Sequence, residues 1–344
     1  MTELDKPLVS IVIPIYNMGE SLKKSVATLQ NQDYDNFEIL LVDDGSIDNS
    51  LDVCNTIAKN DSRVKVFHTE NRGSGPARNE GISKAIGKYI YFPDADDIIE
   101  TNALSVLVYT LESHPECDLA VFGFKSVNHS GTLISEKKYE FAIKNGDDLR
   151  KDYCKCMGSD QEWSIQGAPW NKFFLLSVIK DNNIQYPALR RHQDEGFIGR
   201  YMCYAKAIVF IPNVLYTYFV NDLERTWCKY PLNYIDSVIG LNEVRKETIC
   251  RWNPKDIETH KLIKKGYICN IIKSLELAFS PKMPKTASKL EFINDGILKS
   301  GIRNLELPNN LRLYHRLAIK LFDYPRILLC LLWIKTLIEK YGLR

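Results

Sequence analysis

Short apolar runs alternate with amphipathic stretches along the first part of the chain. The runs are rich in Val, Ile, Leu and Phe, which is typical of buried strands. Strands are predicted over 8–14, 37–42, 64–67, 88–93 and 119–124. Between them, apolar residues at helical spacing predict helices over 21–30, 51–58, 76–86 and 104–111. This alternation predicts an α/β fold with a mostly parallel sheet between helices.

The pattern becomes helical in the last third of the chain. Two further strands, 208–212 and 215–218, end the α/β part. From Leu232 onward, apolar residues keep helical spacing, with breaks at Pro281 and Pro284. The predicted divisions are one domain over 1–225, with halves 1–125 and 126–225, and a helical C-terminal region over 226–344.

The segment 311–344 is basic and apolar. It has seven Lys and Arg residues against Asp323 and Glu339. Its apolar run, 327–334, is far shorter than the roughly 20 residues of a membrane-spanning helix. A basic helix that carries Trp333 suits the surface of an anionic membrane. The alternative is a helix packed on the α/β domain or in a dimer, and both stay open.

Composition excludes several classes of protein. The 344 residues include 45 Lys and Arg and 43 Asp and Glu, so the net charge of +2 favours no nucleic-acid partner. The start, 1–7, has no apolar run and is not expected to be a secretory signal. Among the nine cysteines only Cys154 and Cys156 lie close together, so neither a zinc site nor a disulfide framework is expected. We expect reduced cysteines and a cytoplasmic protein.

Three polar clusters follow predicted strands, at 14–17, 43–46 and 94–97. Ligands of open α/β sheets bind beyond the carboxyl ends of the strands, where these clusters should meet. The third cluster places Asp94, Asp96 and Asp97 directly after a buried strand. Carboxylates so close repel one another unless a cation compensates them. This predicts a divalent cation that in turn binds a phosphate.

Other nucleotide motifs are weak or missing. Gly73 and Gly75 have the spacing of a dinucleotide loop, but Arg78 stands where the third glycine belongs. A Gly-Lys-Ser/Thr sequence is absent, which excludes a P-loop. Simpler roles stay open as well: the 43–46 cluster could cap the following helix, and Arg78 could be an ordinary solvated side chain.

Four motifs together resemble the family 2 glycosyltransferases with the GT-A fold. They are 9–17, 38–46, 71–81 and 91–97, in order and at the spacing of that family. Pro93 departs from the aliphatic residue usual there but replaces none of the acids. The resemblance implies an inverting, metal-dependent hexosyl- or N-acetylhexosaminyl-transferase. It would take a UDP-sugar and build bacterial polysaccharide, capsule or lipopolysaccharide.

The resemblance also assigns the donor site, in the half 1–125. Pro14 and Tyr16 would line the uracil pocket beside Asn17, and Asp44 would accept the N–H of the base. Arg78 would face the base or the phosphates.

The same resemblance identifies an Asp-x-Asp motif. Asp94 would bind the ribose or a metal-bound water, Asp96 would bind Mn²⁺ or Mg²⁺, and Asp97 would assist. The cation would offset the charge that develops on the departing diphosphate.

Inverting transfer needs a general base for the acceptor hydroxyl. Related proteins use the Asp of a Glu-Asp-x-x-Phe segment, and aligning Phe197 places Asp194 there, with Gln193 in place of glutamate. Glu195 is the candidate if the register shifts by one, and His192 is a third. Alternatively, these acids only favour the dipole of a helix start.

The half 126–225 should bind the acceptor. Trp170, Asn171 and Lys172 match a family segment and suit sugar stacking and hydroxyl recognition, although Trp170 could equally belong to the core. Arg225 is a further candidate for contact with the diphosphate. The expected acceptor is a glycan or a lipid-linked glycan, met at the inner face of the cell membrane.

Two functions from other classes remain as alternatives. One is a catalytically silent subunit that binds a sugar nucleotide or acts as a scaffold. The other is a nucleotidyltransferase, which would need a glycine-rich basic loop after the first strand; here no basic residue occurs between Pro14 and Lys23. The oligomeric state is not determined by the sequence, and a homo-oligomer stays open.

Overall fold

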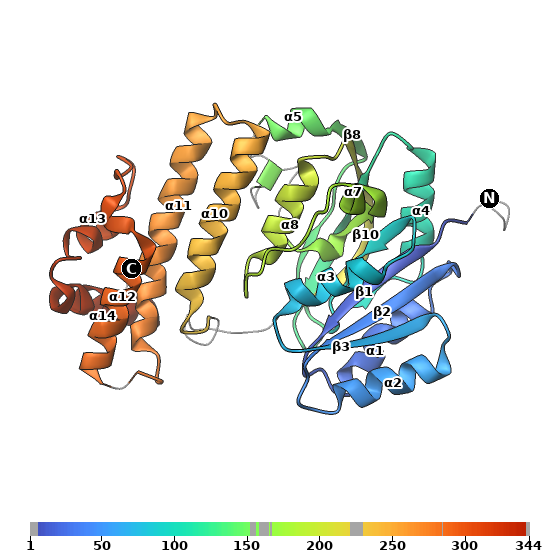
Figure 1. Ribbon diagram of the computed structural model, residues 1–344, viewed down its shortest axis with the longest axis horizontal. Helices are drawn as coiled ribbons and strands as arrows, with labels where there is room; N and C mark the ends of the chain where they lie inside the picture. Colours follow the sequence, from blue (N-terminus) through green and yellow to red (C-terminus); the bar gives the residue numbers. More distant parts are fainter. Residues whose placement is uncertain are drawn as a thin grey trace. The chain divides into compact units, whose positions relative to one another are not determined.

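The computed structural model describes residues 6–151, 156–157, 165, 167–220, 230–283 and 285–341. The chain forms two compact units (Figure 1). The first consists of Met1–Asn221 with Arg251–Asn253, and the second of Asp222–Cys250 with Pro254–Arg344. Cys154, Arg225 and the predicted boundary after residue 225 lie outside the described residues.

The first unit is built on a ten-stranded sheet. Its main path runs β3 (Val64–Thr69), β2 (Phe37–Asp44), β1 (Val9–Ile15), β4 (Tyr89–Tyr91), β9 (Lys172–Leu175), β6 (Leu119–Val127), β10 (Ala207–Phe219) and β5 (Ile98–Ile99). Off this path, β7 (Leu133–Lys137) pairs with β6 and β8 (Ala142–Asn145) with β10. The four strands β1 to β4 pair in parallel, and so do β6 and β10. Their carboxyl ends therefore form one edge, where the three polar clusters lie.

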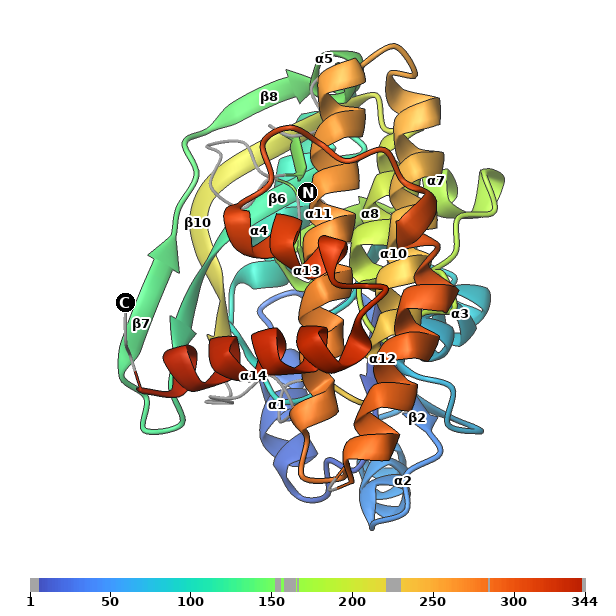
Figure 2. The same ribbon diagram turned by 90° about the vertical axis from the view of Figure 1, so that its left-hand side faces the viewer.

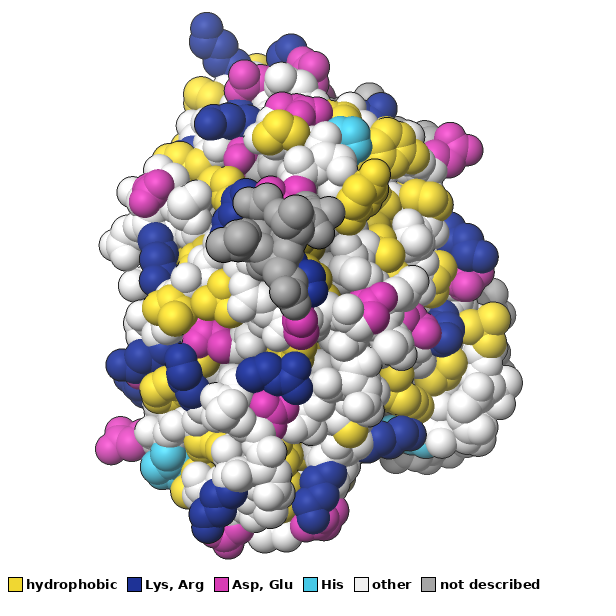
Figure 3. All heavy atoms as spheres, turned by 90° about the vertical axis from the view of Figure 1, so that its right-hand side faces the viewer, with side chains coloured by type: hydrophobic (Ala, Val, Ile, Leu, Met, Phe, Trp, Pro, Cys, Tyr) yellow, Lys and Arg dark blue, Asp and Glu magenta, His cyan; other side chains and the backbone are white. Residues whose placement is uncertain are grey.

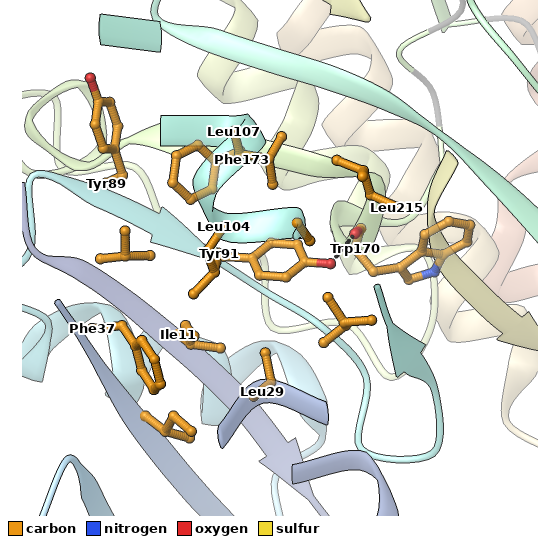
Figure 4. Packing of buried hydrophobic residues seen from close by; sticks show 14 of the residues in the cluster. Ile11, Leu29, Phe37, Tyr89, Tyr91, Leu104, Leu107, Trp170, Phe173 and Leu215 are labelled. Carbon is orange, nitrogen blue, oxygen red and sulfur yellow. Dashed lines mark hydrogen bonds between the residues drawn. The ribbon is translucent and has the colours of Figure 1, made fainter. Parts of the chain in front are cut away.

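Helices cover both faces of this sheet, as predicted. Ile11 belongs to a core cluster with Leu29 of α1 (Ser21–Gln30) and Leu104 of α4 (Ala103–Ser113) (Figure 4). Val12 points to the opposite face, where α3 (Ser74–Lys84) packs so closely that a Cβ on Gly81 would lie 2.2 Å from it. This unit also contains the helices α2 (Ser50–Asn60), α5 (Gly146–Arg150), η2 (Pro169–Asn171), α7 (Leu176–Asp181) and α8 (Gln193–Met202).

The sheet differs from the prediction in several features, among them the short strands β5, β7 and β8, which were not predicted. Lys172–Leu175 forms β9, which pairs antiparallel with both β4 and β6 and was not predicted, because a four-residue strand beginning with lysine has no clear pattern. Residues 207–219 form one strand instead of two. Its register on β6 shifts between Ile211 and Tyr216, around Pro212, which cannot donate to the ladder.

The second unit is helical, in agreement with the periodicity. Its helices are α10 (Tyr234–Trp252), α11 (Ile257–Leu275), η3 (Glu276–Phe279), α12 (Thr286–Ser300), η4 (Ile302–Asn304), α13 (Leu313–Lys320) and α14 (Pro325–Tyr341). The predicted break near Pro281 and Pro284 lies between η3 and α12. Pro325 begins α14, so the C-terminal segment is two helices rather than one.

Each of these two helices buries one side in the core of the unit, through Ala318 of α13 and Leu328 and Leu332 of α14. Within the described residues, no helix is both long and apolar enough to cross a membrane. Basic and acidic side chains are interspersed over the face drawn in Figure 3, as the near-zero net charge leads one to expect.

Candidate active site

The loops after β1 and β2 are tied to each other by side chains of the two predicted clusters. Asn17, at φ 51°, donates its backbone N–H to Ser46 Oγ over 3.0 Å, and its Oδ1 accepts the N–H of Ile47 at 2.9 Å. The N–H groups of Met18 and Gly19 both donate to Ser50 Oγ at 2.8 Å. Asn17 therefore holds the loop, while the ring of Tyr16 next to it is 46% exposed.

The carboxylates that end β2 are buried and have different partners. Asp44 accepts the backbone N–H groups of Arg72 and Gly73 at 2.8 and 2.7 Å, so it fixes the loop that leads into α3. One oxygen of Asp43 lies 2.7 Å from His68 Nδ1, and the other, Oδ1, is buried without a hydrogen-bond partner. A Cβ on Gly45 would lie 2.6 Å from the backbone nitrogen of Asn71, so only glycine fits between these loops.

The three acids after β4 are separated by their environments. Asp96 is exposed, and desolvation together with the neighbouring Asp94 raises its carboxyl pKa. Asp97 is buried, and burial raises its pKa to about 8, although it accepts hydrogen bonds from Tyr216 Oη at 2.6 Å and from the N–H of Phe219 at 2.9 Å. Asp97 thus anchors the loop to β10, and Asp94 and Asp96 remain at the surface of the site.

These two carboxylates fit a divalent cation. Mg²⁺ and Mn²⁺ bind through one or two carboxylates and take further oxygens from phosphate and water. A cation between Asp94 and Asp96 would relieve the repulsion that raises the pKa of Asp96. Among the residues that the structure describes, no group of three or more His, Cys, Asp or Glu side chains is arranged to hold a metal. The bound diphosphate would have to complete the site.

Arg78 joins the acid loop to the predicted base. It is buried on α3 and donates from Nη2 to Asp94 Oδ1 at 2.7 Å and from Nη1 to Asp194 Oδ1 at 3.1 Å. Its guanidinium carbon lies 5.4 Å from the ring centroid of Tyr186, and its Nε has no hydrogen-bond partner. One guanidinium therefore holds two carboxylates that are 100 positions apart in the sequence.

The base candidates lie at the start of α8, where the sequence also allowed these acids to serve only the helix dipole. The N-cap residue is His192, in the left-handed region at φ 65°. Gln193 donates to Ser74 Oγ of α3 at 2.7 Å, and a Cβ on Gly75 would lie 3.2 Å from Gln193 Cγ. Glu195 is buried. The close approach of α8 to α3 brings Asp194 to Arg78.

The charge state of Asp194 depends on its neighbours. Desolvation raises its pKa, while Arg78 and Lys172 lower it and Asp94 raises it. Because the net shift is upward, the Asp194 carboxylate binds a proton more readily than an exposed aspartate does. That property suits a general base for a hydroxyl group.

Trp170, Asn171 and Lys172 are buried where η2 passes into strand β9. The indole of Trp170 stacks on the ring of Tyr216, with centroids 4.7 Å apart and planes 6° apart, and its carbonyl accepts from Tyr91 Oη at 2.9 Å (Figure 4). Lys172 Nζ donates to Asn171 Oδ1 at 2.7 Å, and burial lowers the pKa of this amine to about 7. The three residues support β9 and β10 from within; their contact with an acceptor remains a prediction.

The structure thus brings Arg78, Asp94 and Asp194 together, with Asp96 in the same loop as Asp94. Sequence reasoning missed two tyrosines. Tyr216 holds the acid loop, and Tyr186 packs on Arg78. Neither tyrosine stands in a motif, so no local signal could have identified them.

Comparisons with known proteins identify the family of this chain. Residues 10–161 match the model of Glycosyl transferase family 2. Glycosyltransferase GlyG of Streptococcus pneumoniae is 34% identical over 222 residues, which cover 61% of this chain and 70% of the relative.

Solved structures resemble the whole fold. TarS 1-349 of S. aureus, in a complex with UDP-GlcNAc, has a TM-score of 0.62 and 19% identity, covering 93% of this chain and 88% of that chain. Mannosyltransferase PcManGT of Pyrobaculum calidifontis, in a complex with GDP-Man and Mn²⁺, has a TM-score of 0.53 and 15% identity, covering 97% and 88%. At these identities the likeness concerns the fold, and it confirms the predicted α/β architecture.

Proposed function

Because this chain belongs to glycosyltransferase family 2 and has the GT-A fold, we propose that it is an inverting glycosyltransferase. It transfers a hexosyl or N-acetylhexosaminyl group from a UDP-sugar to a hydroxyl of a glycan acceptor. The acceptor belongs to a growing bacterial surface polysaccharide and is free or lipid-linked.

The bridge from Asp94 through Arg78 to Asp194 carries this proposal. Metal-dependent inverting transfer requires carboxylates that can hold a cation beside the donor diphosphate and, on the other side of the sugar, a carboxylate that takes a proton. Both kinds of group are present here, and one buried guanidinium fixes the distance between them. A silent binding subunit would have no need for a half-buried carboxylate with a raised pKa beside the donor site.

On the donor side, we assign the uracil pocket to Pro14, Tyr16, Asn17 and Asp44. The exposed ring of Tyr16 is available for stacking on the base. The N–H groups of Arg72 and Gly73 fix the orientation of the Asp44 carboxylate, which has further lone pairs for the N–H of uracil.

Asp96 and Asp94 would hold Mn²⁺ or Mg²⁺. The cation, when bound, neutralises charge on the departing UDP. Asp94 would exchange part of its contact with Arg78 for the cation, which leaves the guanidinium to Asp194 and to the phosphates.

On the acceptor side, Asp194 takes the proton of the attacking hydroxyl. His192, the N-cap residue of α8, lies beside it in sequence and is the proposed acceptor contact, whereas Glu195 is buried. Since Trp170, Asn171 and Lys172 are buried, their burial favours a supporting role for this segment over direct stacking on the sugar.

Release of UDP from a panel of UDP-sugars, with a glycan acceptor and with or without Mn²⁺, tests the proposal. We expect release with one donor or a few, and loss of release on chelation of the metal. Binding of UDP-sugars with no turnover on any acceptor would favour the silent subunit. Release of pyrophosphate from UTP and a sugar phosphate would favour the nucleotidyltransferase.

A further inference from the structure

The outer side of α13 and α14 is apolar although it faces solvent. We call it the α13–α14 face. Leu313 is 72% exposed, Ile327 55%, Trp333 51% and Ile334 49%. The other exposed apolar side chains of this face are Leu317, Tyr324 and Ile338.

The packing of the two helices explains why these side chains point outward. Leu328 and Leu332 of α14 are fully buried in the core of the second unit, and Ala318 of α13 is too. Successive residues of an α-helix are rotated by 100°, so Ile327 and Ile334 lie at least 100° round the helix axis from the buried Leu328 and Leu332. α13 and α14 contact each other and lie on the same side of the helical unit (Figure 2). Ile334 and Ile338 of α14 line one cavity together with Arg312 and Tyr314, so the two helices share a surface there.

The charge of this surface is predominantly positive. Four exposed basic residues lie among the apolar ones in the sequence or next to them: Arg312, Arg316, Lys320 and Arg326. The sequence from 311 to 341 has two acids, Asp323, which pairs with Arg303 at 3.3 Å, and Glu339, against six Lys and Arg residues. The apolar side chains are therefore set among cations whose charge is not balanced within these helices.

A cavity of about 480 Å³ opens between the two helices. Leu331, Ile334 and Ile338 form its apolar wall, and Arg312 and Lys335 lie at it as well. Apolar lining with cations suits a molecule that has a hydrocarbon part and an anionic part. Phospholipids have this chemistry.

A second copy of the chain would cover this face less well. A symmetric contact through it would place Arg316 and Lys320 near the same residues of the other copy, and like charges at an interface are unfavourable. A surface of anionic headgroups complements these cations, and the hydrocarbon boundary accepts the apolar residues, including a tryptophan at the interface.

We propose that the α13–α14 face binds the surface of an anionic phospholipid membrane, with α14 lying in the plane of the interface. Trp333 and the isoleucines of α14 enter the boundary between headgroups and hydrocarbon. Arg312, Arg316, Lys320 and Arg326 contact the headgroups. The inference does not depend on the sugar-transfer proposal, because no residue of the first unit takes part.

Co-sedimentation of the full chain with vesicles tests it. The vesicles contain phosphatidylcholine alone, or phosphatidylcholine with 30% phosphatidylglycerol (about one charge in three lipids, enough for an anionic surface potential). We expect binding to the anionic vesicles that is at least tenfold weaker in roughly 0.5 M salt, because the Debye length shortens. Absence of binding to anionic vesicles overturns the proposal.

Two matched charge-reversal variants locate the surface. Arg316→Glu with Lys320→Glu should weaken binding by tenfold or more. Lys246→Glu with Lys261→Glu changes the net charge equally, at exposed positions of the same unit outside this face, and should bind like the unchanged protein. Equal loss in both variants would mean that net charge alone is responsible and would overturn the assignment.

The variant Trp333→Ser tests the apolar part. We expect weaker vesicle binding, unchanged secondary structure by circular dichroism, and unchanged release of UDP in the absence of vesicles. If sedimentation equilibrium shows instead that the unchanged chain is a dimer and that Trp333→Ser makes it a monomer, the face is an interface between copies and the proposal is wrong.

Discussion

The hydroxyl of Tyr216 donates to Asp97 Oδ2 at 2.6 Å and accepts the backbone N–H of Asp94 at 3.0 Å. One side chain of β10 therefore fixes both ends of the acid loop that follows β4. The ring of Tyr216 in turn stacks on the indole of Trp170, which belongs to the core of the first unit. The position of the acid loop therefore depends on this core.

Replacing Tyr216 by Phe should loosen the acid loop. The change leaves the buried carboxyl of Asp97 and the N–H of Asp94 without this partner, which costs about 1–3 kcal/mol of unfolding free energy. We expect a higher concentration of metal for half-maximal UDP release, measured by titration with Mn²⁺. Tyr109→Phe, at an exposed position of α4, is the control. Equal metal dependence of the two variants would contradict the anchoring role.

The acids after β4 should not be equivalent. Asp96→Asn removes a proposed metal ligand, and we expect kcat/KM to fall by about 100-fold, since metal stabilisation of a leaving group amounts to several kcal/mol. Asp97→Asn keeps a side-chain oxygen that can accept a hydrogen bond from Phe219 or Tyr216, so kcat/KM should fall far less. Asp33→Asn, in the loop that leads into the opposite edge of the sheet, controls for loss of a surface charge. Similar losses at positions 96 and 97 would assign the metal to both.

Loss of the proposed base should lower turnover but leave donor binding intact. Asp194→Asn should lower kcat by about 10²–10⁴-fold, the usual contribution of general base catalysis, with little change in the affinity for UDP measured by calorimetry. Glu195→Gln is the neighbouring control and should retain most of its activity. If the large loss is found at Glu195 instead, the register of the family segment is shifted by one.

Arg78 should set the pH dependence of the reaction. Its guanidinium lowers the pKa of Asp194, together with the amine of Lys172, whereas burial and Asp94 raise it. Arg78→Met removes one lowering contribution, so the base stays protonated up to a higher pH. We expect the acidic limb of the kcat profile to shift to higher pH relative to the unchanged enzyme. If the acidic limb of the kcat profile does not shift and only the unfolding free energy falls, Arg78 is a purely structural residue.

Lys172 makes stability depend on pH. Its pKa is about 7 in the folded state against 10.5 for an ordinary lysine, so the unfolded chain binds more protons between these values. The unfolding free energy of the unchanged protein, relative to Lys172→Met, should therefore rise with pH from about 7 to 10.5. Urea denaturation of both proteins at pH 6.5 and 9.5 measures the difference. A difference that is independent of pH would mean that Lys172 keeps its proton in the folded state.

Much of the fold follows from local pattern. The spacing of apolar residues predicted β1 to β4 and the helices between them. Strands and helices bury residues at regular sequence intervals, so residues close together in the chain are enough to reveal them. The clusters that contain Asn17, Asp44 and Asp94 stand directly after those strands. The parallel rule alone places them at one edge.

The second half of the sheet could not be predicted in the same way. β9 is short, begins with the buried Lys172 and lies antiparallel between two strands that are distant in sequence. The single strand β10 was divided at Pro212, because a proline normally ends a central strand, whereas here a shift of register accommodates it.

By itself, the sequence determined the α/β class and the helical C-terminal region, and it named the acids and the candidates for the base. Only the tertiary structure decided that Arg78 joins Asp94 to Asp194, that Asp97 is an anchor, and that one side of α13–α14 remains uncovered. The reason is physical. Periodicity reports whether a residue is buried, but the partner that it meets depends on how elements far apart in the chain pack, as α8 does on α3 through Gln193 and Gly75.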